Sequence, residues 1–500
     1  WRDLPANAEW PLALLATLVS SMLSTLFACL FAGGIAMLVY PGRSWSRLQL
    51  RLPLLLSVPH AAFAVGLFFL LSPSGLLARV IAQLLGWVSP PSWVIVQDPY
   101  ALSLALALAI KESWFLLWVF GAVLGEQEVT RQMVVARSLG YSRFQVWRQV
   151  LWPQLLPRLG WPLTAVFAYG LSVVDMAVIL GPSNPPTFAV LVWHWLSDPS
   201  PAIQAQGAAA AIAMILLLLV AVAGGRWLWQ VARRVRRYPS GRRTANQVDS
   251  RRLQVWPWQL LFGIGYLVVA VLMLWSIAGT WFFPAVWPDG LSFDAWQRAD
   301  FAPFVASLWL AVAVCTITLP VTLLWLEWGP SRFNSVLYLP LIVPALPLAV
   351  GQYAALLRFD LDGSAAGVVW SHLLWVLPYM VLTLIGPYRS FDRRLLTTAQ
   401  AFGRSRLRAC LTVKWPLLVK PILAALSVGF AVSIAQYLPT LFAGGGRFAT
   451  VTTEAVALSA GGNRQVLAVQ ALLQVLLPLA AFGVAAWLAR WAGRQRRGLR

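Results

Sequence analysis

Long apolar runs constrain this chain more than any other feature. A helix of about 20 apolar residues crosses a hydrocarbon layer roughly 30 Å thick, and the sequence contains eleven such runs. Each run is continuous and rich in Leu, Ala and Val, which favours spanning helices over the alternating strands of a barrel. The predicted spans are 11–38, 53–73, 100–124, 160–182, 204–228, 256–279, 302–326, 335–357, 365–386, 421–442 and 465–489.

The composition agrees with an all-α polytopic membrane protein and excludes other classes. Of the 500 residues, 59% are hydrophobic and 11% are charged, whereas about 25% are charged in soluble proteins. The net charge of +21 does not indicate nucleic-acid binding, because the basic residues lie between apolar runs and not on one water-facing surface. Three Cys and three His are too scattered to predict a disulfide framework or a metal site.

The basic residues also orient the chain. Cytoplasmic loops of membrane proteins carry an excess of Lys and Arg, so the C-terminal segment with Arg494, Arg496, Arg497 and Arg500 is predicted to be cytoplasmic. Eleven spans would then place residue 1 outside, and we expect one further helix upstream and twelve spans in the full-length chain. The segments that hold most of the 38 basic residues are 41–52, 125–159, 229–255, 327–334, 387–420 and 490–500.

An internal repeat divides the chain into a first half, 1–228, and a second half, 256–500, joined by an Arg-rich linker, 229–255. Pro59 and Gly66 recur 285 positions later as Pro344 and Gly351. A longer match at an offset of 263 has seven identities without a gap, which indicates two homologous halves. These residues are Ala136, Gly140, Ser142, Arg143, Val150, Trp152 and Pro153, which recur as Ala399, Gly403, Ser405, Arg406, Val413, Trp415 and Pro416.

The repeated loop predicts its own local structure. In each copy a helix ends at a glycine, Gly140 or Gly403, where a positive φ is allowed. A short basic amphipathic helix follows, and Pro153 or Pro416 opens the return toward the membrane. Such a helix could rest on lipid headgroups or dock on another protein. Two equivalent copies favour docking, because a repeat calls for two equivalent partners.

The two loops, 134–153 and 397–416, resemble the EAA loop of binding-protein-dependent ABC importer permeases. Both keep the family's spacing of Ala, Gly, a hydrophobic residue and Pro. They depart from it at Val134 and Thr397, where an acidic residue is usual. They depart again at Trp152 and Trp415, where Leu is usual. Along the whole chain, the resemblance is to fused two-half permeases of the Ynj type, which are related to the thiamine and ferric-iron permeases.

This resemblance implies a permease subunit of the bacterial inner membrane that forms the solute path and is coupled to two cytoplasmic ABC ATPase subunits. A periplasmic solute-binding protein would be the other partner, and thiamine-like compounds, iron complexes and polyamines are candidate solutes. The chain has no phosphate-binding loop closing on Lys-Ser or Lys-Thr, so we expect no enzyme activity and no bound cofactor, with ATP used by the partner. The alternative is an ion-coupled secondary transporter with parallel repeats.

Four polar residues inside the predicted spans are candidates for the solute path. Ionisable groups at membrane depth are rare and usually functional, which singles out Lys111, Glu112 and Asp175. Gln436 is the repeat equivalent of Asp175, and the two would face each other across the interface between the halves. The structural alternatives are an ion pair between Asp175 and Lys111, or Lys111 reaching toward the outer headgroups.

Overall fold

The computed structural model describes residues 9–125, 127–235 and 256–494. Within these ranges the chain is helical, with two isolated bridges and no β-strand. The helices of the first half are α1 (Trp10–Val39), α2 (Arg43–Leu56), α3 (His60–Leu71), α4 (Leu76–Leu85), α5 (Leu102–Leu124), α6 (Gln127–Ser138), α7 (Arg143–Val146), the π-helix η2 (Trp147–Leu151), α8 (Trp152–Arg158), α9 (Gly160–Ser172), α10 (Asp175–Leu180), α11 (Phe188–Leu196) and α12 (Pro201–Val235).

The second half begins after the predicted linker, most of which lies outside the described residues, as do Arg496, Arg497 and Arg500. Its helices are α13 (Trp256–Ser276), α14 (Asp294–Arg298), α15 (Ala302–Trp328), the 3-10 helix η3 (Ser331–Phe333), α16 (Asn334–Leu337), α17 (Leu339–Ile342), α18 (Ala345–Arg358), α19 (Ala365–Arg389), α20 (Arg393–Ala401), α21 (Arg406–Ala409), the π-helix η4 (Cys410–Lys414), α22 (Trp415–Leu417), α23 (Val419–Ile434), α24 (Leu438–Gly444), α25 (Val451–Ser459) and α26 (Arg464–Arg494).

Eight helical segments of the described chain are long and apolar enough to cross a membrane. A ninth is added if Arg406–Leu417 and Val419–Ile434, which meet at a bend of 80°, form one span. The polytopic helical fold is therefore as predicted, while some of the eleven predicted spans are not continuous helices. The eight segments are Trp10–Val39, His60–Leu85, Leu102–Leu124, Pro201–Arg234, Trp256–Ser276, Ala302–Trp328, Ala365–Arg389 and Arg464–Ala492.

Two of the discontinuous spans break at equivalent places in the repeat. In the predicted span 160–182, α9 ends at Ser172 and α10 begins at Asp175. In 421–442, α23 ends at Ile434 and α24 begins at Leu438. Helices that break at membrane depth leave backbone groups unpaired, which is tolerated where protein or a wet cavity surrounds them. The two halves therefore place the same irregular element at the same point.

Proline explains the other interruptions. Pro59 precedes the first residue of α3, and Pro344 precedes the first residue of α18. Pro340 lies in the first turn of the short α17. A proline has no N–H group and disfavours helical conformation in the residue before it, so the predicted spans 53–73 and 335–357 each become several helices.

The repeat is visible in matching contacts. The hydroxyl of Thr17 in α1 accepts the N–H of Phe188, the first residue of α11, at 2.8 Å. The hydroxyl of Ser307 in α15 accepts the N–H of Val451, the first residue of α25, at 2.9 Å. These bonds make α1 the counterpart of α15 and α11 the counterpart of α25, so α13 has no counterpart among the described helices of the first half.

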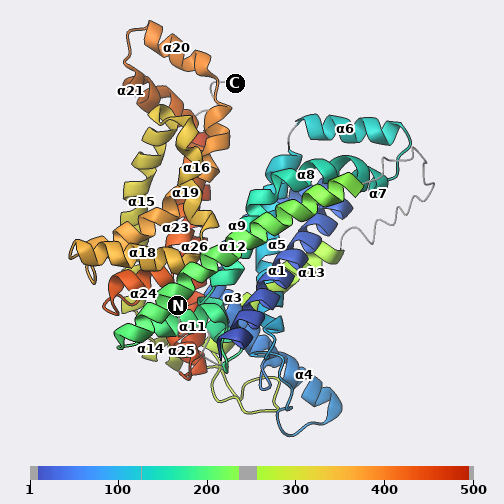
Figure 1. Cartoon of the computed structure of the whole chain (residues 1–500), viewed down its shortest axis with the longest axis vertical. Helices are drawn as coiled ribbons and strands as arrows, with labels where there is room; N and C mark the ends of the chain where they lie inside the picture. The colour runs from blue at the N-terminus through green and yellow to red at the C-terminus, as the bar shows by residue number, and fades with distance from the viewer. Residues whose placement is uncertain (1–8, 126, 236–255, 495–500) are drawn as a thin grey trace.

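The two halves interlock at the middle of the molecule and lean apart toward the end that carries α6 and α20 (Figure 1). Helix α3 of the first half packs against α13, α25 and α26 of the second half. Helix α13 also packs against α2, and Trp258 and Phe262 of α13 belong to the same buried cluster as the first-half core. The sequence boundary between the halves is thus not a boundary in the packing.

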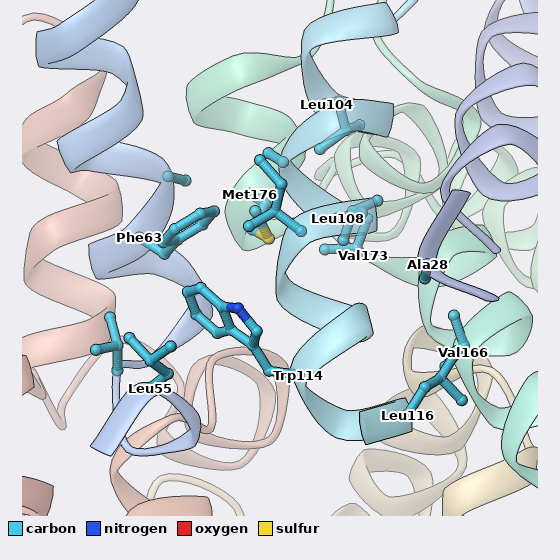
Figure 2. Close-up of a cluster of buried hydrophobic side chains, with 14 of the residues drawn as sticks. Ala28, Leu55, Phe63, Leu104, Leu108, Trp114, Leu116, Val166, Val173 and Met176 are labelled. Atoms are coloured by element: carbon cyan, nitrogen blue, oxygen red, sulfur yellow. The ribbon is translucent and has the colours of Figure 1, made fainter. Parts of the chain in front are cut away.

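The core beside this junction is aromatic. Phe63 of α3 and Trp114 of α5 meet edge to face, with ring centroids 5.4 Å apart and planes at 78°. Figure 2 shows Leu55 and Met176 beside them, and all four are almost fully buried. Aromatic pairs in this geometry add to the packing energy of the buried surface, so they fix α3 against α5 and place the residues that follow on each helix.

Two equivalent glycines differ in their surroundings and allow a matched test. A Cβ at Gly66 would overlap the side chain of Val268 and lie 3.0 Å from its carbonyl oxygen, whereas a Cβ at Gly351 would meet nothing within 4 Å. We expect Gly66→Ala to lower the free energy of unfolding by about 1–3 kcal/mol through overpacking. Gly351→Ala should raise it by up to about 1 kcal/mol through helix propensity. Thermal unfolding of the purified variants measures both, and equal shifts would contradict the packing described for α3.

Candidate coupling loops and solute path

The two repeated loops have the same backbone. Gly140 follows α6 with φ of +87°, and Gly403 follows α20 with φ of +78°. The N–H of the next residue reaches back in each copy, from Tyr141 to the carbonyl of Ala136 at 3.2 Å and from Arg404 to that of Ala399 at 3.3 Å. These bonds satisfy carbonyl groups that the end of a helix leaves free. The predicted helix ends with positive φ are therefore present in both loops.

The next turns match as well. Ser142 and Ser405 cap the short helices α7 and α21, accepting the N–H groups of Gln145 and Arg408 at 3.3 Å. Each short helix continues into a five-residue π-helix, η2 or η4, at the same offset of 263. A π-helix is rare and often marks a functional element. The seven sequence identities therefore encode one conserved shape.

Both loops lie at the same end of the molecule (Figure 1). Ala136 and Ala399 are buried in them, and Val150, Val413, Pro153 and Pro416 are half-buried. The residue before each glycine is apolar and exposed, with Leu139 52% and Phe402 82% accessible. A groove of about 420 Å³ lies along α6. Its lining residues are Arg131, Gln132, Val135, Ala136, Leu139, Tyr141, Gln149 and Val150.

An arginine in each loop binds the end of a membrane helix. Arg143 donates to the carbonyl oxygen of Tyr40, just after α1, at 2.7 Å. Its equivalent, Arg406, donates to the carbonyl oxygen of Glu327 near the end of α15 at 3.0 Å, and to the Glu327 carboxylate at 2.9 and 3.0 Å. Since α1 and α15 are counterparts, both loops are attached to the same helix of their own half.

The ammonium group of Lys111 lies among backbone carbonyl groups. It donates to the carbonyl oxygens of Leu55 and Val58 at the break before Pro59, where the Leu55 carbonyl also accepts the N–H of Val58 at 3.3 Å. It also lies 5.0 Å from the centre of the Trp114 ring. The ammonium group thus satisfies backbone groups that would be costly to leave unpaired in a membrane, and it makes no ion pair with Asp175.

Glu112 and Asp175 instead meet His60 and a set of tyrosines. The Glu112 carboxylate lies 3.0 Å from Nε2 of His60. The His60 ring is 4.7 Å from that of Tyr169, whose hydroxyl interacts with the Asp175 carboxylate. Sequence reasoning singled out the two carboxylates but missed His60 and Tyr169, although His60 directly follows the repeated Pro59.

The second half adds two tyrosines to this group. Tyr437 interacts electrostatically with Asp175, and Tyr379 interacts electrostatically with Glu112. The Tyr437 ring also lies 6.4 Å from the Trp193 ring of the first half, centre to centre. The side chain of Gln436 donates within its own segment, to the carbonyl of Val432 at 3.2 Å. Gln436 therefore makes a local hydrogen bond, and its place opposite Asp175 in the solute path stays a prediction.

The sequences of known proteins identify the family to which this chain belongs. No protein-family model matches the chain. The inner membrane ABC transporter permease protein YnjC of Escherichia coli K12 is 42% identical over 509 aligned positions, covering all of this chain and 92% of that protein. The chain belongs to the ABC transporter permeases. It is a multi-pass transport subunit of the membrane.

Two shorter matches lie in the same class. The molybdenum transport system permease protein ModB of Haemophilus influenzae is 28% identical over 158 residues, covering 27% of this permease and 68% of ModB. The spermidine/putrescine transport system permease protein PotC of the same organism is 20% identical over 117 residues, covering 23% of this permease and 46% of PotC. Each match spans about a quarter of the chain, as expected where relatives share part of one half.

The second loop of the permease is attached to the membrane helices through Glu327. Oε2 of Glu327 accepts from Lys414 Nζ at 2.7 Å and from the hydroxyl of Tyr388 at 2.9 Å. Trp415 donates to that hydroxyl at 3.1 Å. The side chains of Glu327 and Lys414 are only 3% and 8% exposed, so η4 is joined to α15 and α19 by a buried ionic cluster.

The first loop uses packing at the equivalent place. Trp152, the counterpart of Trp415, stacks on Phe120 of α5 with ring centroids 6.3 Å apart. It also approaches α1 so closely that a Cβ at Gly33 would lie 2.9 Å from its ring. Tryptophan thus serves both loops as an anchor to the membrane helices, which gives a physical reason for the departure from Leu at these positions.

Proposed function

We propose that this chain is the permease of an ATP-driven, binding-protein-dependent importer of the bacterial inner membrane. Its two halves form the solute path, two cytoplasmic ABC ATPase subunits contact the loops after α6 and α20, and a periplasmic protein delivers the solute. The observation that carries the proposal is the pair of loops with one backbone shape at one end of the molecule. The end with these loops and the C-terminus would face the cytoplasm.

The contacts between the loops and the membrane helices suggest how movement of the ATPase subunits reaches the solute path. When ATP binding brings the two ATPase subunits together, the loops would move toward each other. Arg143 would carry that movement to α1, and Arg406 with Glu327 would carry it to α15. Nucleotide shifts the equilibrium between inward-facing and outward-facing states only by binding them with different affinity, so the loops must have different positions in the two states.

Family membership alone does not select the solute. The two weaker relatives are named for transport of molybdenum and of spermidine or putrescine, which differ in chemistry. Thiamine-like compounds, iron complexes and polyamines all stay within the proposal.

The exposed apolar residues before the glycines offer a direct test of docking. We expect Leu139→Ser and Phe402→Ser each to weaken association with the ATPase subunits at least tenfold, because each removes an exposed apolar side chain from a loop that needs a partner. Co-purification of the ATPase with the permease in detergent measures the effect, and uptake in cells should fall in parallel.

The matched control is Phe293→Ser. Phe293 is 64% exposed and precedes α14, on the loop that follows α13 and away from both coupling loops. Its substitution should leave ATPase association unchanged. Full ATPase binding by the Leu139 and Phe402 variants, or transport by the purified permease without any nucleotide, would refute the proposal.

A further inference from the structure

One group of side chains at the junction of the halves has no role in coupling. We name it the interface cluster, and it comprises His60, Glu112, Tyr169, Asp175, Tyr379 and Tyr437. The first four come from α3, α5, α9 and α10 of the first half, and the tyrosines at 379 and 437 come from α19 and the break before α24 in the second half. Tyr437 of the second half lies against Trp193 of the first half, with ring centres 6.4 Å apart, so the cluster lies at the junction of the halves, where a solute path between them would run.

The charge of the cluster is negative and incompletely balanced. Glu112 and Asp175 are 8% and 7% exposed. Oε1 of Glu112 is paired with His60, while Oε2 accepts no hydrogen bond from the described residues and is not among their buried unpaired atoms, so it keeps accessible surface. Lys111 is the nearest cation along the chain, and its ammonium group donates to the backbone carbonyl oxygens of Leu55 and Val58. A carboxylate oxygen that keeps accessible surface can form a charge-assisted hydrogen bond with a bound cation.

The walls of the cluster are aromatic and reachable. Tyr169 and Tyr379 lie deep among the helices, yet both keep part of their surface accessible. The His60 side chain is 29% exposed, and Trp193 lies 6.4 Å from Tyr437, ring centre to ring centre. Nε1 of Trp193 is buried without a partner. The accessible surface of these residues means that they are not packed on all sides.

We propose that the interface cluster is a binding site for an organic cation, a solute with one or more positively charged nitrogen centres. This inference rests on the proposed function and names its substrate class. Aromatic faces attract such a nitrogen, most strongly where water is excluded, and two separated carboxylates match its charge. A metal ion fits less well, because no group of three His, Cys, Asp or Glu in the described chain is close enough together to hold one.

Binding to the purified full-length permease in nanodiscs tests the site with four probes. These are choline, its neutral isostere 3,3-dimethylbutan-1-ol, putrescine and molybdate. We expect choline or putrescine to bind in calorimetry, and the isostere and molybdate not to bind. Glu112→Gln and Asp175→Asn should each weaken cation binding at least tenfold, since both keep the size of the side chain and remove its charge. Asp362→Asn, at an exposed position, should have no effect.

Tyr379→Leu separates the aromatic contribution from charge and from folding. It leaves both carboxylates in place and should still weaken choline binding several-fold, with unchanged thermal unfolding. The inference is overturned if neither cation binds, if the isostere binds as well as choline, or if molybdate binds instead. Those outcomes would leave ATPase association and its loss in Phe402→Ser intact, so failure of the site is distinguishable from failure of the proposed function.

Discussion

Glu327→Leu is expected to lower the free energy of unfolding of the permease by about 3–5 kcal/mol, the usual effect of removing one partner from a buried ion pair. The substitution leaves Lys414, whose side chain is 8% exposed, without its carboxylate, and it removes the acceptor of Tyr388 and Arg406. Because the cluster joins the second loop to α15 and α19, uptake should be lost as well. Thermal unfolding of the purified variant and solute uptake in cells are the two measurements.

A double variant distinguishes the buried charge from the lost contact. Glu327→Leu combined with Lys414→Met removes both charges, and we expect it to recover most of the stability, since an apolar pair can replace a buried ion pair at little cost. It should not recover uptake, because Arg406 still lacks its carboxylate. The control is Asp392→Ala, which removes an exposed helix cap and should cost about 1 kcal/mol. A double variant no more stable than Glu327→Leu would contradict the cluster.

Gly140→Val and Gly403→Val are expected to abolish transport while leaving membrane insertion intact. A β-branched residue is strongly disfavoured at the observed φ of +87° and +78°, with a cost of about 1–2 kcal/mol that the loop can avoid only by changing shape. At Gly403 a Cβ would meet nothing within 4 Å, so any effect there comes from the backbone and not from a clash. We expect uptake to fall more than tenfold.

ATPase activity shows whether the loss is uncoupling. If the loops transmit movement, the ATPase subunits should still hydrolyse ATP when mixed with these variants, but hydrolysis should no longer depend on the solute-loaded binding protein. Gly224→Val is the control, because Gly224 lies within α12 and a Cβ there would also meet nothing within 4 Å. Normal uptake by either loop variant would show that the positive φ is not needed for coupling.

Much of the conformation of the repeated loops can be predicted from the sequence alone. Their helix ends, glycine conformations and serine caps depend on residues within about ten positions of one another, so local rules apply to them directly. Because the two loops are copies of one repeat, the sequence predicts the same function for both. The π-helices at Trp147–Leu151 and Cys410–Lys414 were not predicted, because the i to i+5 pattern leaves no simple signature in the sequence.

The contacts of the intramembrane charged residues could not be predicted from local sequence rules. Lys111 and Glu112 are neighbours in sequence, yet one satisfies backbone carbonyls near Pro59 and the other pairs with His60. The high cost of charge in lipid predicts that both residues are functionally important. Their separate contacts depend on residues about 50 positions away in the chain. The role of Glu327 was not predicted, because its partners, Arg406 and Lys414, lie on a loop with the composition of an exposed segment.

The sequence by itself determined that the chain is a polytopic helical membrane protein, that it consists of two related halves, and where the two loops lie. Hydrophobic periodicity and turn residues are properties of short segments, and the internal repeat is a property of the sequence itself. None of the three depends on how the helices pack. Only the tertiary structure decided that α13 packs across the boundary of the halves, and that Tyr437 of the second half lies against Trp193 of the first. It also decided that a buried ion pair joins η4 to α15, while Trp152 stacks on α5 at the equivalent place of the first loop. Such contacts join residues far apart in the sequence, and their energies exist only once the helices have packed.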